Sequence, residues 1–309
     1  MKKTLGIFAL LSILIFSLLG CTEKTNEQIP AEAVVGSKGV FYEVTHEDTT
    51  VYLFGSVHIG LPTMYPLHEK IESAFDSADH LAVEININDL NPAEMMQLVT
   101  EIGLYSDGST IEDHISADLY EELLNSISEL GLQENGVTMF KPWLVSDMLE
   151  SVILEKAGFA LELGVDQYFL DKAVEDNKEI ISLETIKQQL ELYTILSPES
   201  QEKALRATLL EQEENQAKIA ELIEMWIAGD ITGLSELRII EDDSQDMRDY
   251  FTALTDERDL KMTAKIEDFL TNGKSETYFV VVGALHLVGE NSIVDLLESR
   301  GYDVKIGIE

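Results

Sequence analysis

Two histidines, each three residues after a glycine, are the side chains best placed to do chemistry. Gly55-Ser56-Val57-His58 follows the apolar run 51–54, and Gly283-Ala284-Leu285-His286 follows the apolar run 278–282. Each run predicts a short β-strand. The glycine lets the chain turn away from the sheet edge, so that the histidine faces the crevice beyond the strand end, where open α/β sheets bind ligands. We therefore expect His58 and His286 to share one site.

Two further apolar runs end in carboxylates. Glu84 follows the run 80–83, and Glu184 follows the run 179–183. Two imidazoles and two carboxylates at strand ends can bind a divalent cation and still leave a base for catalysis. Taken alone, either histidine is explained at least equally well by helix capping or by packing after a turn glycine. The combination of all four residues favours a site.

Other catalytic patterns are absent. The chain after His68 does not read H-E-x-x-H, the zincin motif. Ser56 lacks the G-x-S-x-G turn of serine hydrolases, and Cys21 is the only cysteine, so the domain after it has neither a thiol nucleophile nor a disulfide. Glu290 lies four residues after His286, and on a helix the two would share a face. We keep Glu290 as a second-tier site residue.

The N-terminus predicts export and lipid attachment. Lys2 and Lys3 precede an apolar stretch of about 15 residues, which suits a signal-peptide core and is short for a membrane-spanning helix. Leu18-Leu19-Gly20-Cys21 looks like a bacterial lipobox. We predict a lipoprotein signal peptide over residues 1–20, a lipidated Cys21 with a flexible tether over residues 21–38, and a position on the extracytoplasmic face of the bacterial cell membrane. The alternative is an uncleaved membrane anchor.

The charge balance is strongly acidic. The 309 residues carry 58 acidic and 21 basic side chains, a formal charge of −37. Residues 1–20 contain two lysines and no acid, so the charge after their removal is −39. Nucleic acid is excluded as a partner, because binding phosphates needs clustered lysine and arginine. The excess is most simply a solubilising surface, and it would also attract cationic peptides or divalent cations.

The pattern of elements predicts one domain over residues 39–309 with an α/β (α+β) fold. Segments 39–45 and 50–54 predict a β-hairpin, and the strands before the four candidate site residues are followed by a last strand at 302–308. Helical periodicity dominates the two blocks 91–177 and 186–272. The second block is expected to hold two long helices, 197–228 and 243–270. We predict a central mixed β-sheet with two G-x-x-H strand ends and large helical insertions.

Several motifs occur in an order and spacing that match a known family. They are residues 52–60 around the first G-x-x-H, Ala82-Val83-Glu84, Lys141-Pro142-Trp143, Ser182-Leu183-Glu184-Thr185, and residues 282–290 followed by Gly301-Tyr302-Asp303-Val304. In these motifs the chain resembles the TraB/PrgY/GumN family, which is related to the Tiki metalloproteases. The resemblance covers almost everything from residue 38 to the C-terminus.

The resemblance implies a divalent ion, Mn, Co or Zn, held by His58, His286 and a glutamate, which we take to be Glu184. The other glutamate, Glu84, would accept a proton from the water that attacks a peptide carbonyl. Arg258 would clamp a substrate carboxylate or an oxyanion. The family shows Arg-Asn where this chain has Arg258-Asp259, and a carboxylate cannot donate a hydrogen bond unless it is protonated.

The function implied is that of a membrane-anchored, metal-dependent hydrolase of the peptidase kind. Its partner would be an extracytoplasmic peptide or small protein. The alternative is a non-catalytic envelope protein that binds or inactivates a peptide or a pheromone.

Overall fold

The computed structural model describes residues 36–239, 244–273 and 275–308. The predicted signal peptide, Cys21 and most of the predicted tether lie outside the described residues. Ser37 and Lys38, which we assigned to the tether, donate backbone hydrogen bonds to Pro66 and Ile227. The folded domain therefore includes these two residues.

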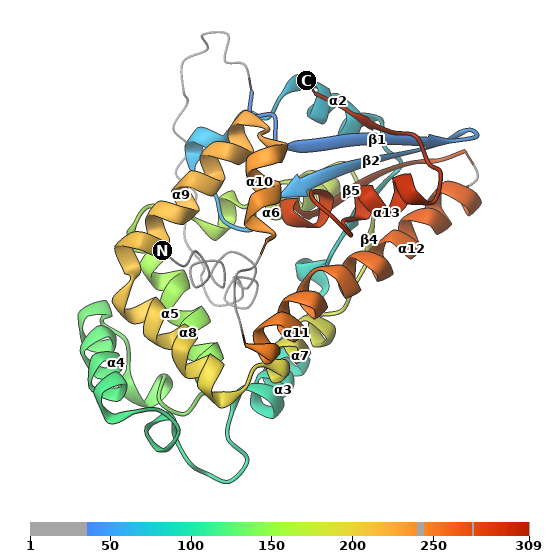
Figure 1. The fold of residues 1–309 in the computed structure, drawn as a ribbon. Helices are drawn as coiled ribbons and strands as arrows, with labels where there is room; N and C mark the ends of the chain where they lie inside the picture. Colours follow the sequence, from blue (N-terminus) through green and yellow to red (C-terminus); the bar gives the residue numbers. More distant parts are fainter. Residues whose placement is uncertain (1–35, 240–243, 274, 309) are drawn as a thin grey trace.

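The strands of the described residues form one mixed six-stranded sheet in the order β4-β3-β5-β2-β1-β6 (Figure 1). They are β1 (Val40–His46), β2 (Thr49–Ser56), β3 (His80–Val83), β4 (Glu179–Ser182), β5 (Thr277–Gly283) and β6 (Val304–Ile306). Strand β1 runs antiparallel to β2 and β6, whereas β2, β3, β4 and β5 are parallel neighbours. The predicted mixed α/β fold and the N-terminal hairpin are confirmed.

Some helices lie against the sheet, and the others extend away from it (Figure 1). Those that pack on the sheet or follow its strands are α2 (Glu69–Ser77), α6 (Val165–Glu175), α12 (Asp256–Asn272) and α13 (Ile293–Ser299). The others are α3 (Pro92–Gly103), α4 (Ala117–Leu130), α5 (Pro142–Lys156), α7 (Ile186–Leu192), α8 (Pro198–Leu210), α9 (Gln212–Ala228), α10 (Ile231–Leu237) and α11 (Gln245–Leu254).

Both long helices expected in the second helical block are wrong, because each is broken into two. Glu211 separates α8 from α9 with a ψ of 29°, and Thr255 separates α11 from α12 with a φ of −111° and a ψ of −81°. The Thr255 hydroxyl donates to the Phe251 carbonyl, a local bond that competes with regular helix geometry. Apolar periodicity continues through such a break, so the pattern did not detect it. The break places Arg258 and Asp259 in the first turn of α12.

Aromatic side chains fix the sheet to the helices. Phe54 of β2 contacts Phe169 of α6 with ring centroids 5.6 Å apart, and Phe279 of β5 lies 5.6 Å from Phe75 of α2. Trp226 of α9 is fully buried, and its indole N–H donates to the Gly55 carbonyl at 2.7 Å. Helix α9 is thus bound to the sheet at the glycine of the first G-x-x-H motif.

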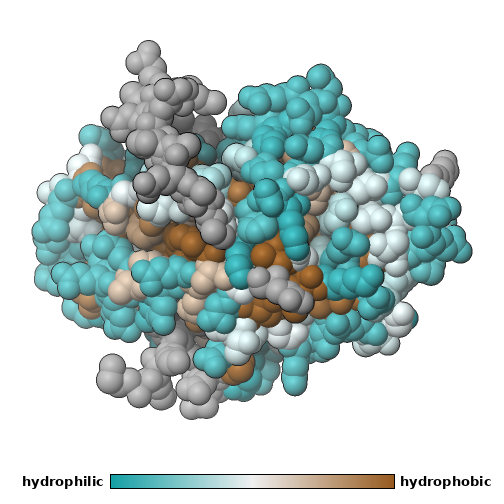
Figure 2. Space-filling model, turned by 90° about the horizontal axis from the view of Figure 1, so that it is seen from above, coloured by the Kyte–Doolittle hydropathy of each residue, from teal (hydrophilic) through white to brown (hydrophobic). Residues whose placement is uncertain are grey.

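The surface agrees with the acidic composition. Figure 2 shows a mostly hydrophilic exterior with hydrophobic residues gathered across the middle of the face in view. Among the described residues, no helix combines the length and the apolar character that a membrane crossing requires.

Candidate functional site

The parallel strands bring the four predicted residues to one edge of the sheet. In the strand register Ser56 lies opposite Gly283, and Val83 lies opposite both Val281 and Ser182. The chain leaves all four strands at the same edge, as expected for parallel strands. His58, Glu84, Glu184 and His286 follow these strand ends in the sequence.

Gly283 lies at the centre of this group. A Cβ atom at Gly283 would be 3.4 Å from Glu84 Oε1, 3.4 Å from His286 Cδ2 and 3.9 Å from His58 Nε2. The Gly283 N–H donates to Glu84 Oε1 at 2.7 Å, and His286 Nε2 lies 3.6 Å from the same oxygen. Three of the predicted side chains therefore surround one glycine.

The two motif glycines have different surroundings. Gly283 has a φ of −50° and a ψ of 137°, which other residues also adopt. Our expectation that glycine serves the turn by its conformational freedom is therefore wrong for Gly283. At Gly55 a Cβ atom would lie 2.8 Å from the Ala284 Cα and 2.9 Å from the Val40 Cβ, so close packing excludes any side chain there.

Each histidine is held by an aspartate through Nδ1. Asp166 of α6 binds His58 Nδ1 at 2.8 Å, and its other oxygen accepts a hydrogen bond from the Ser56 hydroxyl at 2.8 Å. Asp259 of α12 binds His286 Nδ1 at 2.5 Å. With Nδ1 donating to a carboxylate, a neutral imidazole presents the lone pair of Nε2, which is the arrangement of metal-binding histidines.

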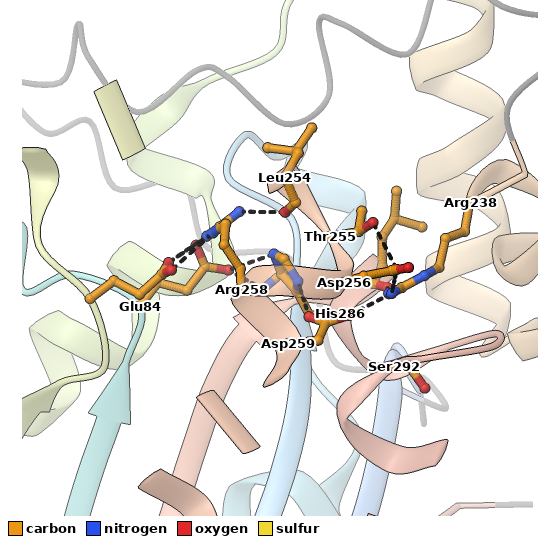
Figure 3. Close-up of polar contacts among 12 residues, drawn as sticks. Glu84, Arg238, Leu254, Thr255, Asp256, Arg258, Asp259, His286 and Ser292 are labelled. Atoms are coloured by element: carbon orange, nitrogen blue, oxygen red, sulfur yellow. Dashed lines mark hydrogen bonds and ion pairs between the residues drawn. The ribbon is translucent and has the colours of Figure 1, made fainter. Parts of the chain in front are cut away.

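Arg238 balances the charge of Asp259, as Figure 3 shows. Asp259 is fully buried, and its second oxygen lies 2.6 Å from the Arg238 guanidinium. The same guanidinium donates to the Leu285 carbonyl at 2.6 Å and contacts Asp256 at 2.9 Å. The aspartate at the family's asparagine position therefore acts as an acceptor for His286, and Arg238 supplies its counter-charge.

Arg258 holds the two glutamates, and all three side chains are buried. One guanidinium nitrogen lies 2.6 Å from both Glu84 Oε2 and Glu184 Oε2, and Nε donates to Glu184 at 3.0 Å. Gln189 of α7 donates to the same two carboxylates at 2.9 and 3.2 Å. Glu84 thus spans Arg258 and His286, whereas the polar contacts of the Glu184 carboxylate are with Arg258 and Gln189.

The charges of the site shift the pKa values of its groups in opposite directions. Burial alone would lower the pKa of His58, but the Asp166 carboxylate, with Glu84, raises it to about 9. Burial alone would raise the pKa of Glu84, but the charges of Arg258 and His286 hold it well below its usual range. Glu84 is therefore an ionised carboxylate, and the ion-free His58 is protonated at neutral pH.

The donor types around Gly283 fit a transition-metal ion, although their present spacing does not close around one. Within residues 36–239, 244–273 and 275–308, no three histidine, cysteine, aspartate or glutamate side chains are grouped closely enough to hold an ion. Two imidazole nitrogens and a carboxylate oxygen are nevertheless the donor set of hydrolytic zinc sites. Holding an ion would require His58, His286 and Glu84 to move inward toward one another.

Glu290 lies apart from this group. His286 is in the 3-10 turn η8 (Ala284–Leu287), and α13 begins only at Ile293, so the helical face expected to join Glu290 to His286 does not form. Glu290 is exposed and lines a surface cavity of about 630 Å³ together with Arg238. Its predicted neighbour His286 is buried, and Asp259 lies between His286 and Arg238 and contacts both.

Sequence reasoning did not find Asp166, Gln189 or Arg238. Asp166 is 108 residues from His58 and stands in the first turn of an ordinary amphipathic helix. A nearby sign of this contact is Gly164, two residues before Asp166, where a Cβ atom would lie 2.4 Å from the His58 carbonyl oxygen. These contacts arise only when distant segments fold together.

Comparison with known families gives this geometry a context. The model of the TraB/PrgY/gumN family matches residues 40–306. This chain belongs to that family. The match covers all six strands and every residue of the site described above.

Relatives of known name are distant. The chain is 24% identical to the uncharacterized protein YbaP of Escherichia coli over 80% of this chain and 87% of that protein. It is 20% identical to the metalloprotease TIKI1 of Xenopus tropicalis and 22% identical to a metalloprotease TIKI homolog of Amphimedon queenslandica. These matches span 83% and 82% of this chain but 59% of each TIKI protein. No solved structure matches the chain.

Proposed function

We propose that this TraB/PrgY/gumN family protein is a metal-dependent hydrolase that cleaves peptides. The observation that carries the proposal is the group around Gly283, in which His58 Nε2, His286 and Glu84 Oε1 face one point. Distant similarity to proteins named metalloproteases supports the same reaction class.

His58, His286 and Glu84 would hold the ion. Asp166 and Asp259 fix the two rings through Nδ1 and so direct Nε2 inward. Glu84 suits this role better than proton transfer, because its low pKa keeps it ionised. A bound divalent ion would polarise a substrate carbonyl and lower the pKa of a water molecule toward about 7.

The remaining glutamate has a different task in this arrangement. Glu184 binds Arg258 through both oxygens, so it orients the guanidinium that also keeps Glu84 charged. Binding of the ion by Glu184 with proton acceptance by Glu84, the assignment that the resemblance implies, stays a prediction, as does a direct contact between Arg258 and a substrate.

Metal analysis combined with peptide hydrolysis tests the proposal. We expect about one divalent ion per chain and hydrolysis of unstructured peptides that a chelator abolishes. Glu84→Gln should lose both properties, whereas Glu94→Gln, a change of an exposed residue in α3, should keep both. A wild-type protein that binds peptides without an ion and without turnover would contradict the proposal and favour the peptide-binding alternative.

We also propose that lipid on Cys21 anchors the protein on the extracytoplasmic face of the membrane. The support is the sequence Leu18-Leu19-Gly20-Cys21 after an apolar segment. Cys21→Ser should release the protein from the membrane fraction with its fold unchanged. Normal processing and continued membrane association of this variant would contradict the lipid anchor.

A further inference from the structure

Helix α5 carries two buried carboxylates that the site around Gly283 does not use. Asp147 is 3% exposed and Glu150 is 7% exposed. Neither carboxylate oxygen of Asp147 has a hydrogen-bond partner among the described residues. Buried polar groups are almost always paired, so an unpartnered buried carboxylate calls for an explanation.

The neighbours of α5 show which way this pair faces. Trp143, one turn before Asp147, stacks on Tyr193 at 4.2 Å between ring centroids. Leu154, two turns after Asp147, belongs to the hydrophobic cluster over the sheet. The opposite face of α5, with Val145, Leu149 and Ile153, packs into a different cluster, formed with α4 and α8. Residues three, four and seven apart share a helical face, so Asp147 lies between the Tyr193 contact and the sheet cluster.

This face of α5 contacts, through Trp143, the segment that follows α7. Tyr193 follows α7, the helix that carries Gln189, and Gln189 donates to Glu84 and Glu184. In Figure 1, α5 and α8 lie on the left of the molecule, and α7 and α11 lie at its lower right. The face of α5 that carries Asp147 therefore lies between the segment after α7 and the hydrophobic cluster over the sheet.

The described residues supply no counter-charge for the pair. Among the described residues, no lysine or arginine forms an ion pair with Asp147 or Glu150. Burial raises the pKa of Glu150 to about 8, and burial with the charge of Glu150 raises the pKa of Asp147 well above its usual value. Such a pair must take up protons or receive a cation from outside the described part of the chain.

We propose that Asp147 and Glu150 bind a positively charged group of the substrate, either a lysine or arginine side chain or a free amino terminus. The proposal rests on the proposed function in that the ligand is a peptide. Charge-assisted hydrogen bonds from an ammonium or guanidinium group would satisfy the unpartnered oxygens of Asp147. The acidic excess of 58 carboxylates over 21 basic side chains would draw such peptides toward the protein.

Peptide binding to matched variants tests this assignment. The ligands are short, otherwise uncharged peptides that carry one lysine, or norleucine in its place, each with a free or an acetylated amino end. Calorimetry in the presence of a chelator measures binding to wild type, Asp147→Asn, Glu150→Gln and the control Glu155→Gln. Glu155 is exposed on the same helix, so the control removes one charge without touching the buried pair.

We expect wild type and Glu155→Gln to bind the lysine peptide whose amino end is acetylated about tenfold more tightly than the matching norleucine peptide. Asp147→Asn and Glu150→Gln should lose this preference and bind the norleucine peptide as wild type does. A preference that follows the free amino end and disappears in both variants assigns the subsite to the peptide terminus. Either substitution suffices if the other variant fails to fold.

Two outcomes would overturn the assignment. One is equal binding of charged and uncharged peptides by wild type, and the other is an unchanged preference in Asp147→Asn. Both would leave Asp147 and Glu150 as protonated core residues. A charge preference that depends on Asp147, in a protein that hydrolyses no peptide, would contradict the proposed hydrolase function and leave this subsite standing.

Discussion

Gly283→Ala tests whether an ion binds in the space beside Gly283 without lowering the stability of the folded protein. The new Cβ atom would lie 3.4 Å from Glu84 Oε1 and 3.9 Å from His58 Nε2, which are ordinary contact distances. Alanine also tolerates the backbone angles of Gly283. Exchange of glycine for alanine at such a position stabilises a protein by about 0.4–1 kcal/mol, because the unfolded chain has fewer conformations. The variant should therefore fold and melt at or slightly above the wild-type temperature.

The same methyl group should block the ion. Nitrogen and oxygen ligands lie about 2.0–2.2 Å from zinc, so the three side chains around Gly283 must close in on a common point. The methyl group occupies the space toward which they would move. We expect the affinity for a divalent ion to fall at least about tenfold, equivalent to about 1.4 kcal/mol, and peptide hydrolysis to fall with it.

The assay pairs thermal unfolding in chelator with calorimetric titration of zinc and manganese. Gly136→Ala is the matched control, since a Cβ atom there meets only the Gln133 side chain at 3.8 Å. Gly55→Ala is a contrasting variant, because its Cβ atom would overlap Ala284 and Val40. Its free energy of unfolding should be lower than that of wild type by about 1–3 kcal/mol. Wild-type metal affinity and activity in Gly283→Ala would refute the view that an ion binds in this space.

Three further predictions follow from the polar contacts. Metal affinity should rise about tenfold per pH unit up to about pH 9, because the ion must displace the proton of His58, whose pKa is about 9; a flat profile between pH 6 and 8 would contradict His58 as a ligand. Asp166→Asn should lower metal affinity about tenfold to a hundredfold and lower the His58 pKa measured by NMR, whereas Asp171→Asn, on the same helix and exposed, should change neither. Glu150 binds its proton more tightly in the folded state, so its contribution to stability falls as the pH rises from about 4.5 to about 8. Without peptide, Glu150→Gln should therefore be more stable than wild type by about 3 kcal/mol at pH 7 and little different at pH 4, as chemical denaturation can measure.

Short-range pattern was enough to predict the scaffold. The hairpin segments 39–45 and 50–54, the apolar runs before Glu84 and Glu184, and the helical periodicity of the blocks 91–177 and 186–272 depend on local geometry. The structure has the corresponding strands and helices. The common edge for His58 and His286 also followed from sequence, because parallel strands end together.

The interior of the site was decided by tertiary structure. Which glutamate faces the histidines depends on the strand order, because β3 lies directly beside β5 whereas β4 is one strand further away. Arg258 binds both glutamates, and its position follows from the break at Thr255, a single residue that helical periodicity does not reveal. Asp166 and Arg238 reach the histidine network from helices 108 and 48 residues away from His58 and His286. Sequence patterns record the spacing of neighbours along the chain, whereas charge pairing in a buried site depends on which distant segments the core brings into contact.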